Sequence, residues 1–325
     1  EMDSKKGGTN MNVLFSLNIN EKHRQRLRES FPEVTFSFNE SMGQAVEEVG
    51  KANVLVAFGG QVTEEIVEQA THLKWIMVMT AGVDQLPKEI IKRKNILVTN
   101  ARGIHKTPMA EYAISMLLQV TRNEKKLIKN ETAHKWEQVH VDELREKTIL
   151  IAGTGAIGSE VARLAKAFNM KTIGVSKSGK SVEYFDENVE SKSILQKLSE
   201  ADCVVSVLPS TPETIHFFTY EHFKQMPNHG VFLNMGRGDV LELDELVRAL
   251  REKEIAHAIL DVFDVEPLPE DHYLWDMSSI TITPHISGLS PFYITRALEI
   301  FTHNLEQFTK QQSEMINQIN ISRGY

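Results

Sequence analysis

Short apolar runs alternate with helix-length amphipathic segments along almost the whole chain of 325 residues. This alternation is typical of α/β proteins, in which crossover helices join parallel strands. The runs form two sets, so we expect two parallel sheets in two domains, which the chain length also favours. The first set is 12–17, 54–58, 75–79 and 96–99, and the second is 148–151, 171–175, 203–208, 231–234, 258–262 and 280–283.

Two further segments have helical patterns. From Thr107 the chain reads TPMAEYAISMLL, with apolar residues around nearly the whole circumference, so we expect a buried helix, most simply between the domains. Thr107 is the expected N-cap, and Pro108 suits the first helical position. Residues 292–308 again have helical spacing. A terminal helix without a strand of its own can pack on the first domain and make that domain discontinuous.

Charge and cysteine content limit the class of protein. The chain has 36 Lys and Arg against 44 Asp and Glu, a net charge of −8, which offers no electrostatic reason to bind nucleic acid or an anionic membrane. The single cysteine, Cys203, lies in an apolar run, which excludes an intrachain disulfide framework and suits a reducing cytoplasm. We therefore predict a cytoplasmic protein. Its polar residues 1–10 read as a flexible tail or a cloning remnant.

A glycine-rich turn marks a dinucleotide site. The strand-like KTILIAG leads directly into GTGAIG, and SEVARLAKAF continues as a helix. Gly153 permits the tight turn, Gly155 lets the backbone approach a pyrophosphate, and Gly158 allows close packing of helix and strand. The helix N-terminus then offers free amides to the phosphates. The alternative is a glycine turn without a ligand.

The end of the next strand bears on the cofactor. An NAD site usually has an acidic residue there for the ribose hydroxyls. This chain instead has Ser176, Lys177 and Ser178, with no carboxylate before Glu183. Hydroxyl and ammonium groups suit a 2′-phosphate, so NADPH is favoured. The alternative is a solvated loop in an enzyme indifferent to the two cofactors.

Three residues just beyond apolar runs have the chemistry of an active site: Arg237, Glu266 and His285. Side chains at the carboxyl ends of parallel strands can converge on one crevice. Arg237 can fork onto a carboxylate and its adjacent keto oxygen. A carboxylate beside the His285 imidazole favours its protonated form, which can donate a proton near neutral pH. Each residue alone also reads as an ordinary loop residue.

These residues, with TAGVDQL, MAEYAISMLL, GTGAIG, LPSTPET, NMGRGDVL, ILDVFDVEPLP and TPHISGLS, closely resemble the D-isomer-specific 2-hydroxyacid dehydrogenase family. The resemblance implies a flavodoxin-like substrate-binding domain, here residues 11–102 with 292–325. It also implies a Rossmann domain at residues 103–291, with the active site in the cleft between the two domains. The family typically dimerises through its cofactor domain, so a homodimer is expected.

The resemblance also assigns roles. Arg237 would bind the substrate carboxylate and carbonyl, His285 would be the general acid/base, and Glu266 would orient it. The amides of Ala81, Gly82 and Val83 would hold the substrate carboxylate, and Asp261 would contact the nicotinamide carboxamide. The remaining expected cofactor-binding residues are Gly153, Thr154, Gly155, Ala156, Ile157, Gly158, Ser176, Lys177, Ser178, Leu208, Pro209, Thr214 and Met235.

The prediction is therefore an NAD(P)-dependent reductase that converts a small 2-keto acid into the D-2-hydroxy acid, with NADPH favoured and no metal ion. Ser176-Lys177-Ser178 resembles the NADPH-using branch that reduces glyoxylate and hydroxypyruvate, and Glu266 argues against formate dehydrogenase, which usually has Gln there. Two alternatives stay open. One is a cofactor-sensing binding protein of the corepressor type, and the other is an NADH-dependent phosphoglycerate dehydrogenase without a regulatory domain.

Overall fold

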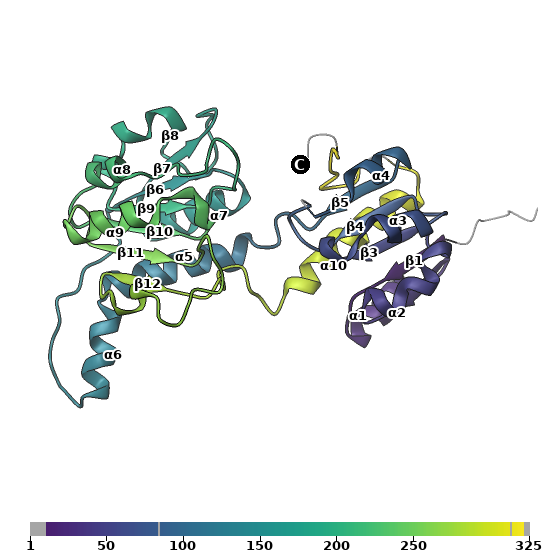
Figure 1. Cartoon of the computed structure of the whole chain (residues 1–325), viewed down its shortest axis with the longest axis horizontal. Coiled ribbons are helices and arrows are strands. Elements are labelled where there is room, and N and C mark those ends of the chain that lie inside the picture. The colour runs from purple at the N-terminus through teal and green to yellow at the C-terminus, as the bar shows by residue number, and fades with distance from the viewer. Residues whose placement is uncertain (1–10, 84, 313, 322–325) are drawn as a thin grey trace, which may run out of the picture. The chain divides into compact units, whose positions relative to one another are not determined.

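The computed structural model describes residues 11–83, 85–312 and 314–321, so the predicted tail at residues 1–10 lies outside the described residues. The chain divides into two compact units (Figure 1). One is formed by the chain up to Ile104 together with the chain from Pro291, and the other is His105–Ser290. Each unit contains a parallel sheet, so the predicted α/β class is confirmed. The roles of the units in binding substrate and cofactor stay predictions.

The strands of the first unit are β1 (Met11–Phe15), β2 (Val34–Phe38), β3 (Val54–Ala57), β4 (Trp75–Val78) and β5 (Leu97–Asn100). Its helices are α1 (Glu21–Ser30), α2 (Met42–Ala45), α3 (Glu64–Gln69), α4 (Lys88–Arg93) and α10 (Tyr293–Thr309). The sheet order is β2-β1-β3-β4-β5, that of flavodoxin-like folds. The C-terminal helix α10 packs on this sheet, where Phe301 stacks on Trp75 and meets Phe15 edge-on.

The strands of the second unit are β6 (Thr148–Ala152), β7 (Lys171–Ser176), β8 (Glu187–Glu190), β9 (Cys203–Ser206), β10 (Val231–Asn234), β11 (His257–Leu260) and β12 (Ile280–Ile282). Its helices are α5 (Lys106–Thr121), α6 (Glu124–Thr132), α7 (Ala156–Ala167), α8 (Tyr220–Gln225) and α9 (Leu243–Arg251). The sheet order is β12-β11-β10-β9-β6-β7-β8. From β6 the chain runs through β7 to β8 at one edge of the sheet, and it then crosses back to form β9 on the other side of β6. Ligands of such sheets bind at this switch point, outside the carboxyl ends of the strands.

Two strands and one helix start differ from the sequence-based expectations. The apolar runs do not predict β2 and β8, which lie at sheet edges, and every residue of β8 stays partly exposed. The helix expected to start at Thr107 begins at Lys106 with His105 as its cap, so the N-cap prediction is wrong. Residues 102–105 already form a turn that leads into the helix. The helix α5 packs one face against α7, while Glu111 stays exposed.

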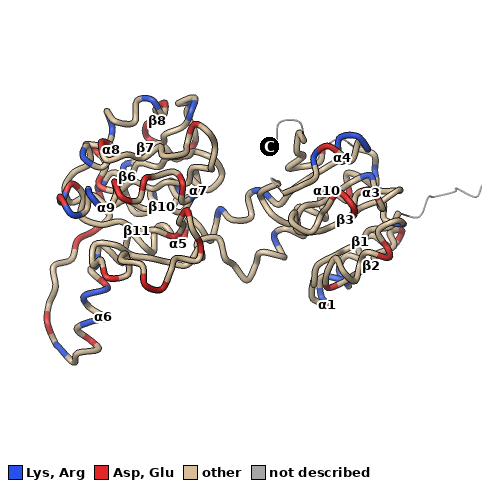
Figure 2. The backbone as a smooth tube through the Cα atoms, viewed as in Figure 1, with Lys and Arg blue, Asp and Glu red and all other residues tan. Residues whose placement is uncertain are grey.

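Charged side chains of both signs are spread over both units (Figure 2). Within the described part of the chain, no helix combines the length and apolar character needed to cross a bilayer. The same residues contain no group of three His, Cys, Asp or Glu that could hold a metal ion. Cys203 is buried in the core, and burial raises the pKa of its thiol to about 12. This thiol is therefore unreactive near neutral pH.

Candidate active site

Arg237 stands on a turn that its neighbours hold closely. The buried Asn234 side chain donates from Nδ2 to the Arg237 carbonyl at 2.9 Å and accepts from the Gly236 amide at 3.2 Å. A Cβ at Gly236 would lie 2.4 Å from the Leu208 carbonyl oxygen, and one at Gly238 would lie 2.1 Å from the Phe263 carbonyl carbon. Both glycines are therefore required by adjoining loops that pass close to the turn.

His285 and Glu266 form a direct pair. Nδ1 of His285 lies 2.7 Å from Oε2 of Glu266, and the other carboxylate oxygen accepts from the Phe263 amide at 2.9 Å. An ionised carboxylate can only accept a hydrogen bond, so Nδ1 carries the proton. Nε2 is therefore the ring atom left to exchange a proton with a substrate. Part of the His285 side chain is solvent-exposed.

The charge of the Glu266 carboxylate is stabilised by its surroundings. Burial alone would raise the pKa of Glu266, but hydrogen bonds from His285 and the Phe263 amide, with the charges of His285 and Arg237, hold that pKa below its ordinary value. The carboxylate is therefore ionised near neutral pH. The exposed Arg237 guanidinium lies close enough to act on Glu266 electrostatically. The structure thus brings Arg237, Glu266 and His285 together within the second unit.

The glycine turn after β6 has the geometry of a phosphate site. Gly153 has a φ of +105°, which favours glycine, and a Cβ at Gly158 would lie 1.8 Å from the Gly153 carbonyl oxygen. At Gly155, by contrast, a Cβ would meet no protein atom within 4 Å. Gly155 caps α7 without a side-chain acceptor, so the first amides of Ala156, Ile157 and Gly158 are available to an anion.

The loop after β7 curls back on itself. Ser176 Oγ accepts from the Gly179 amide at 3.1 Å, and Ser178 Oγ accepts from the Lys180 amide at 3.4 Å. Lys177 Nζ lies 3.4 Å from Glu213 Oε1, with both side chains exposed. An exposed pair of this kind contributes little stability, so the ammonium can exchange Glu213 for another anion.

Other predicted cofactor-binding residues have varied surroundings. Thr214 Oγ1 donates to the Pro209 carbonyl at 2.5 Å, which closes the loop that follows Leu208. Thr154 accepts at its carbonyl from Ser159 Oγ at 3.2 Å. The Met235 side chain is buried in the core, so only its backbone can face a cofactor. The Asp261 carboxylate is fully buried and already accepts a hydrogen bond from Thr283. Its contact with a nicotinamide stays a prediction.

The predicted carboxylate-binding loop lies in the first unit, after β4. Asn100 Nδ2 donates to the Ala81 carbonyl at 2.5 Å, Thr80 Oγ1 donates to the Gly82 carbonyl at 2.8 Å, and the Leu86 amide donates to the Val83 carbonyl at 3.2 Å. In the described ranges, none of the amides of Ala81, Gly82 and Val83 donates a hydrogen bond. The loop therefore has its carbonyls occupied and its amides unused.

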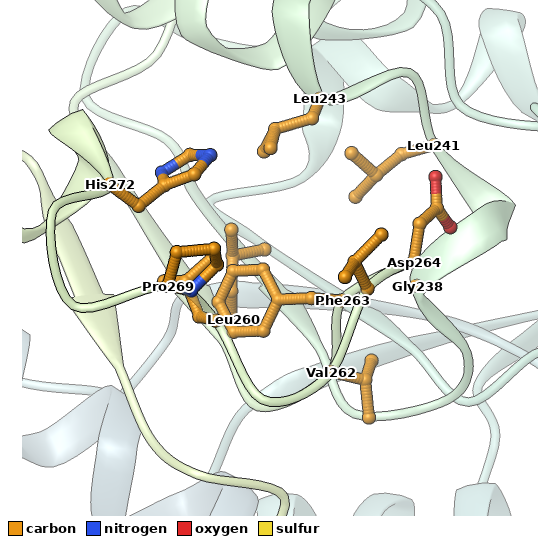
Figure 3. A pocket seen from close by; sticks show the side chains of 11 residues that line it. Gly238, Leu241, Leu243, Leu260, Val262, Phe263, Asp264, Pro269 and His272 are labelled. Carbon is orange, nitrogen blue, oxygen red and sulfur yellow. The ribbon is translucent and has the colours of Figure 1, made fainter.

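A pocket of about 260 Å³ lies within the second unit (Figure 3). Its walls come from the turn after Arg237 and the segment around Glu266, and they are mostly apolar, with His272 and Asp264 at the margin. None of Arg237, Glu266 and His285 lines this pocket. It is therefore separate from the pair of His285 and Glu266.

Sequence reasoning missed three polar side chains around the His285 loop. Tyr112, Thr283 and His105 contact that loop or its support through hydrogen bonds. Tyr112 lies in the quoted MAEY motif and Thr283 directly precedes Pro284, but neither position alone indicates a role. No sequence pattern distinguishes His105 from the other histidines.

Comparison with known proteins identifies the family. The chain matches the family model described as "D-isomer specific 2-hydroxyacid dehydrogenase, NAD binding domain" over residues 114–287. Its match to a glyoxylate reductase of Pyrococcus furiosus is 31% identical over 276 residues and covers 82% of each chain. Its match to a D-3-phosphoglycerate dehydrogenase of Methanocaldococcus jannaschii is 30% identical over 270 residues. That match covers 80% of this chain and 50% of the relative.

A solved structure agrees. The D-isomer specific 2-hydroxyacid dehydrogenase family protein from Aeromonas salmonicida is similar with a TM-score of 0.84 and 32% identity, over 96% of this chain and 100% of that chain. The matched NAD-binding domain, the oxidoreductase relatives and the parallel-sheet fold define the class of protein as an NAD(P)-dependent oxidoreductase. The chain belongs to the D-isomer specific 2-hydroxyacid dehydrogenase family.

Proposed function

We propose that this protein reduces a small 2-keto acid to the D-2-hydroxy acid and favours NADPH. The observation that carries the proposal is the 2.7 Å contact of His285 with Glu266, close to Arg237, in the unit that holds the glycine turn. The relative named glyoxylate reductase supports the same substrate class. Glyoxylate and hydroxypyruvate are therefore the first substrates to test.

The glycine turn fits a dinucleotide because Gly155 has open space around it and the first amides of α7 have no side-chain cap. Gly153 to Gly158 would hold the pyrophosphate, with Leu208, Pro209 and Thr214 along the cofactor. When bound, the nicotinamide supplies a hydride to the keto carbon.

The chain's own residues supply charge and a proton. Arg237 forks onto the substrate carboxylate and keto oxygen and so stabilises negative charge as it develops on that oxygen. Protonated His285 donates from Nε2 to the same oxygen, while Glu266 orients the ring and stabilises its positive charge. We also propose that the amides of Ala81, Gly82 and Val83 bind the carboxylate, since these amides donate no hydrogen bond to any residue that the structure describes. The buried Asp261 is proposed to accept from the carboxamide with its remaining lone pair.

One assay series tests the reaction. Purified protein is supplied with NADPH or NADH and with glyoxylate, hydroxypyruvate, pyruvate, 2-ketobutyrate, branched keto acids and 3-phosphohydroxypyruvate, and product chirality is determined. We expect turnover with a small keto acid and the D-product. Replacing His285 by Ala should lower kcat roughly 10²- to 10⁴-fold, whereas replacing Arg237 should also raise KM.

Other outcomes select the alternatives. Tight NAD(P)H binding without turnover on any keto acid would favour a cofactor-sensing binding protein. Turnover confined to 3-phosphohydroxypyruvate with NADH would favour the phosphoglycerate dehydrogenase reaction. This substrate is included because the Methanocaldococcus relative is named a D-3-phosphoglycerate dehydrogenase. An His285→Ala protein with unchanged kcat would overturn the proposed mechanism.

We propose a homodimer formed through the cofactor unit. In that unit, α6 and the segment after it project away from the sheet (Figure 1). This arm exposes Leu127, Ile128 and Val141, and Trp136 is fully exposed. Large apolar side chains gathered on one projection are typical of an interaction surface. Light scattering should show a dimer that Trp136→Ser weakens, while Tyr184→Ser, on an exposed tyrosine elsewhere, should not. A monomer at micromolar concentration would reject the proposal.

We propose the cytoplasm as the location. The buried, unpaired Cys203 supports this proposal because it makes no demand on an oxidising compartment,. Cell fractionation with an epitope-tagged protein tests it, and recovery in the secreted fraction would contradict it.

A further inference from the structure

The backbone of His285 is held in a conformation that needs support. Its φ is +52°, in the left-handed region that residues with a side chain adopt at an energetic cost,. The His285 amide donates to the Asp261 carbonyl at 2.9 Å and to the Thr283 carbonyl at 3.1 Å. The loop that carries the imidazole is thus tied to the end of β11.

The Asp261 side chain supports the residues that follow His285. Its carboxylate is fully buried and accepts from the Ile286 amide at 2.9 Å and from the Ser287 amide at 3.0 Å. It also accepts from Thr283 Oγ1 at 2.6 Å. One carboxylate therefore holds the loop on both sides of His285.

Tyr112 supports this carboxylate from α5. Its hydroxyl lies 2.6 Å from Thr283 Oγ1. The single hydroxyl proton of Thr283 goes to Asp261, which can only accept, so the Tyr112 hydroxyl must be the donor to Thr283. Burial is the main cause that raises the pKa of Tyr112, and the Asp261 charge raises it further. The hydrogen bond with Thr283 acts on this pKa in the opposite direction but is outweighed. Tyr112 therefore stays a protonated donor at every pH at which the enzyme would be assayed.

The helix α5 reaches the same loop at a second point. The ring of His105, which caps α5, lies with Nδ1 3.3 Å from the Gly288 carbonyl oxygen. A Cβ at Gly288 would approach that nitrogen to 3.0 Å, so the ring and the loop backbone are closely packed. Contacts from α5 thus hold the loop on both sides of the imidazole.

We propose that Tyr112 is a positioning residue for the reaction: through Thr283 and Asp261 it keeps His285 in the left-handed conformation that aims Nε2 at the substrate. This inference rests on the proposed role of His285 as the proton donor. Tyr112 touches neither substrate nor cofactor in this scheme. Its effect is on the proton-transfer step. The Ile286 and Ser287 amides still hold the Asp261 carboxylate when the Tyr112 hydroxyl is removed, so the proposed contact of Asp261 with the carboxamide, and with it the cofactor Kd, should change little.

Tyr112→Phe tests the proposal, because it removes one hydroxyl and keeps the ring in its buried place. We expect kcat for keto acid reduction to fall about tenfold, with the cofactor Kd and the thermal unfolding temperature little changed. Tyr184→Phe, on an exposed tyrosine of the same unit, is the matched control and should leave kcat unchanged. Thr283→Val should reproduce the kcat loss, and Thr283→Ser, which keeps the hydroxyl, should restore most of the activity.

The result can be separated from a failure of the proposed function. If His285→Ala is inactive but Tyr112→Phe and Thr283→Val keep full kcat, the positioning role is wrong and the function stands. Equal losses of kcat and cofactor affinity in Tyr112→Phe would show a general structural role and also overturn the inference. If His285→Ala keeps its kcat, the proposed function itself is wrong.

Discussion

Nδ1 of His285 lies 2.7 Å from Oε2 of Glu266, although the two residues are 19 positions apart in the chain. Both belong to the same compact unit, so this pair is assembled within one fold. The carboxylate fixes which ring nitrogen carries a proton and leaves the other for the substrate. Replacing the carboxylate by an amide of the same shape should therefore change the chemistry and leave the fold intact.

Glu266→Gln should lower kcat about 10²-fold, because the protonated imidazole loses a stabilising negative charge and the ring loses its orienting acceptor. Steady-state kinetics at pH 7 measure kcat and KM for keto acid reduction. Glu270→Gln, on an exposed acid of the same loop, should match the wild type. An unchanged kcat in Glu266→Gln would exclude the pairing role.

Gly158 and Gly155 should respond differently to alanine. At Gly158 the added Cβ would lie 1.8 Å from a backbone oxygen, so α7 must move, and stability should fall by at least about 2 kcal/mol. At Gly155 the Cβ meets no protein atom within 4 Å and φ is −74°. Gly155→Ala should therefore unfold at the wild-type temperature but raise the cofactor Kd about tenfold or more, because the methyl group blocks the approach of the pyrophosphate.

Thermal unfolding without ligand and fluorescence titration with NADPH and NADH separate the two effects. Normal cofactor affinity in Gly155→Ala would show that the pyrophosphate does not approach this turn. Wild-type stability in Gly158→Ala would show that helix and strand are less closely packed than the structure has them.

The strands that apolar runs predict well are interior ones such as β9 and β10, since burial on both faces removes polar residues from the sequence,. The edge strands β2 and β8 have no such run, and β8 reads ENVE. Their pairing depends on a neighbour already in place. The start of α5 is set by the turn before it, which a capping pattern at Thr107 does not encode.

The site could be predicted in part for a related reason. Arg237, Glu266 and His285 each follow an apolar run, and parallel strand ends share one sheet edge. The support behind His285 could not be predicted in this way. The contact of Tyr112 with Thr283 depends on how α5 packs against the end of β12, and residue spacing carries no information on that packing. The burial of Asp261 and Met235 was equally hidden, because strand ends can be exposed or covered.

His257 should make the protein less stable in acid. Burial, chiefly, and the nearby Lys125 charge lower the pKa of His257 from 6.5 to about 4. Between these values the unfolded chain binds a proton that the folded chain excludes, so stability falls as the pH drops from about 6.5 to about 4. The full effect is on the order of 3 kcal/mol. Denaturant unfolding at pH 7 and pH 4 should show a smaller loss in His257→Gln than in the wild type or in the exposed His140→Gln. Equal losses of stability in the wild type and in both variants would show that His257 is not the source of the acid sensitivity.

Lys177 and Glu213 should control cofactor preference in opposite directions. Their side chains are exposed and lie 3.4 Å apart, so an incoming 2′-phosphate would compete with Glu213 for the ammonium group. Lys177→Ala should raise KM for NADPH several-fold and leave KM for NADH nearly unchanged, since only NADPH carries the phosphate. Glu213→Gln should lower KM for NADPH, because it frees the lysine and removes a repelling charge. Measuring kcat/KM for both cofactors at low and at moderate ionic strength tests this, as the effects should shrink with added salt. Parallel changes for NADPH and NADH, or a wild-type preference for NADH, would reject this loop as a phosphate site.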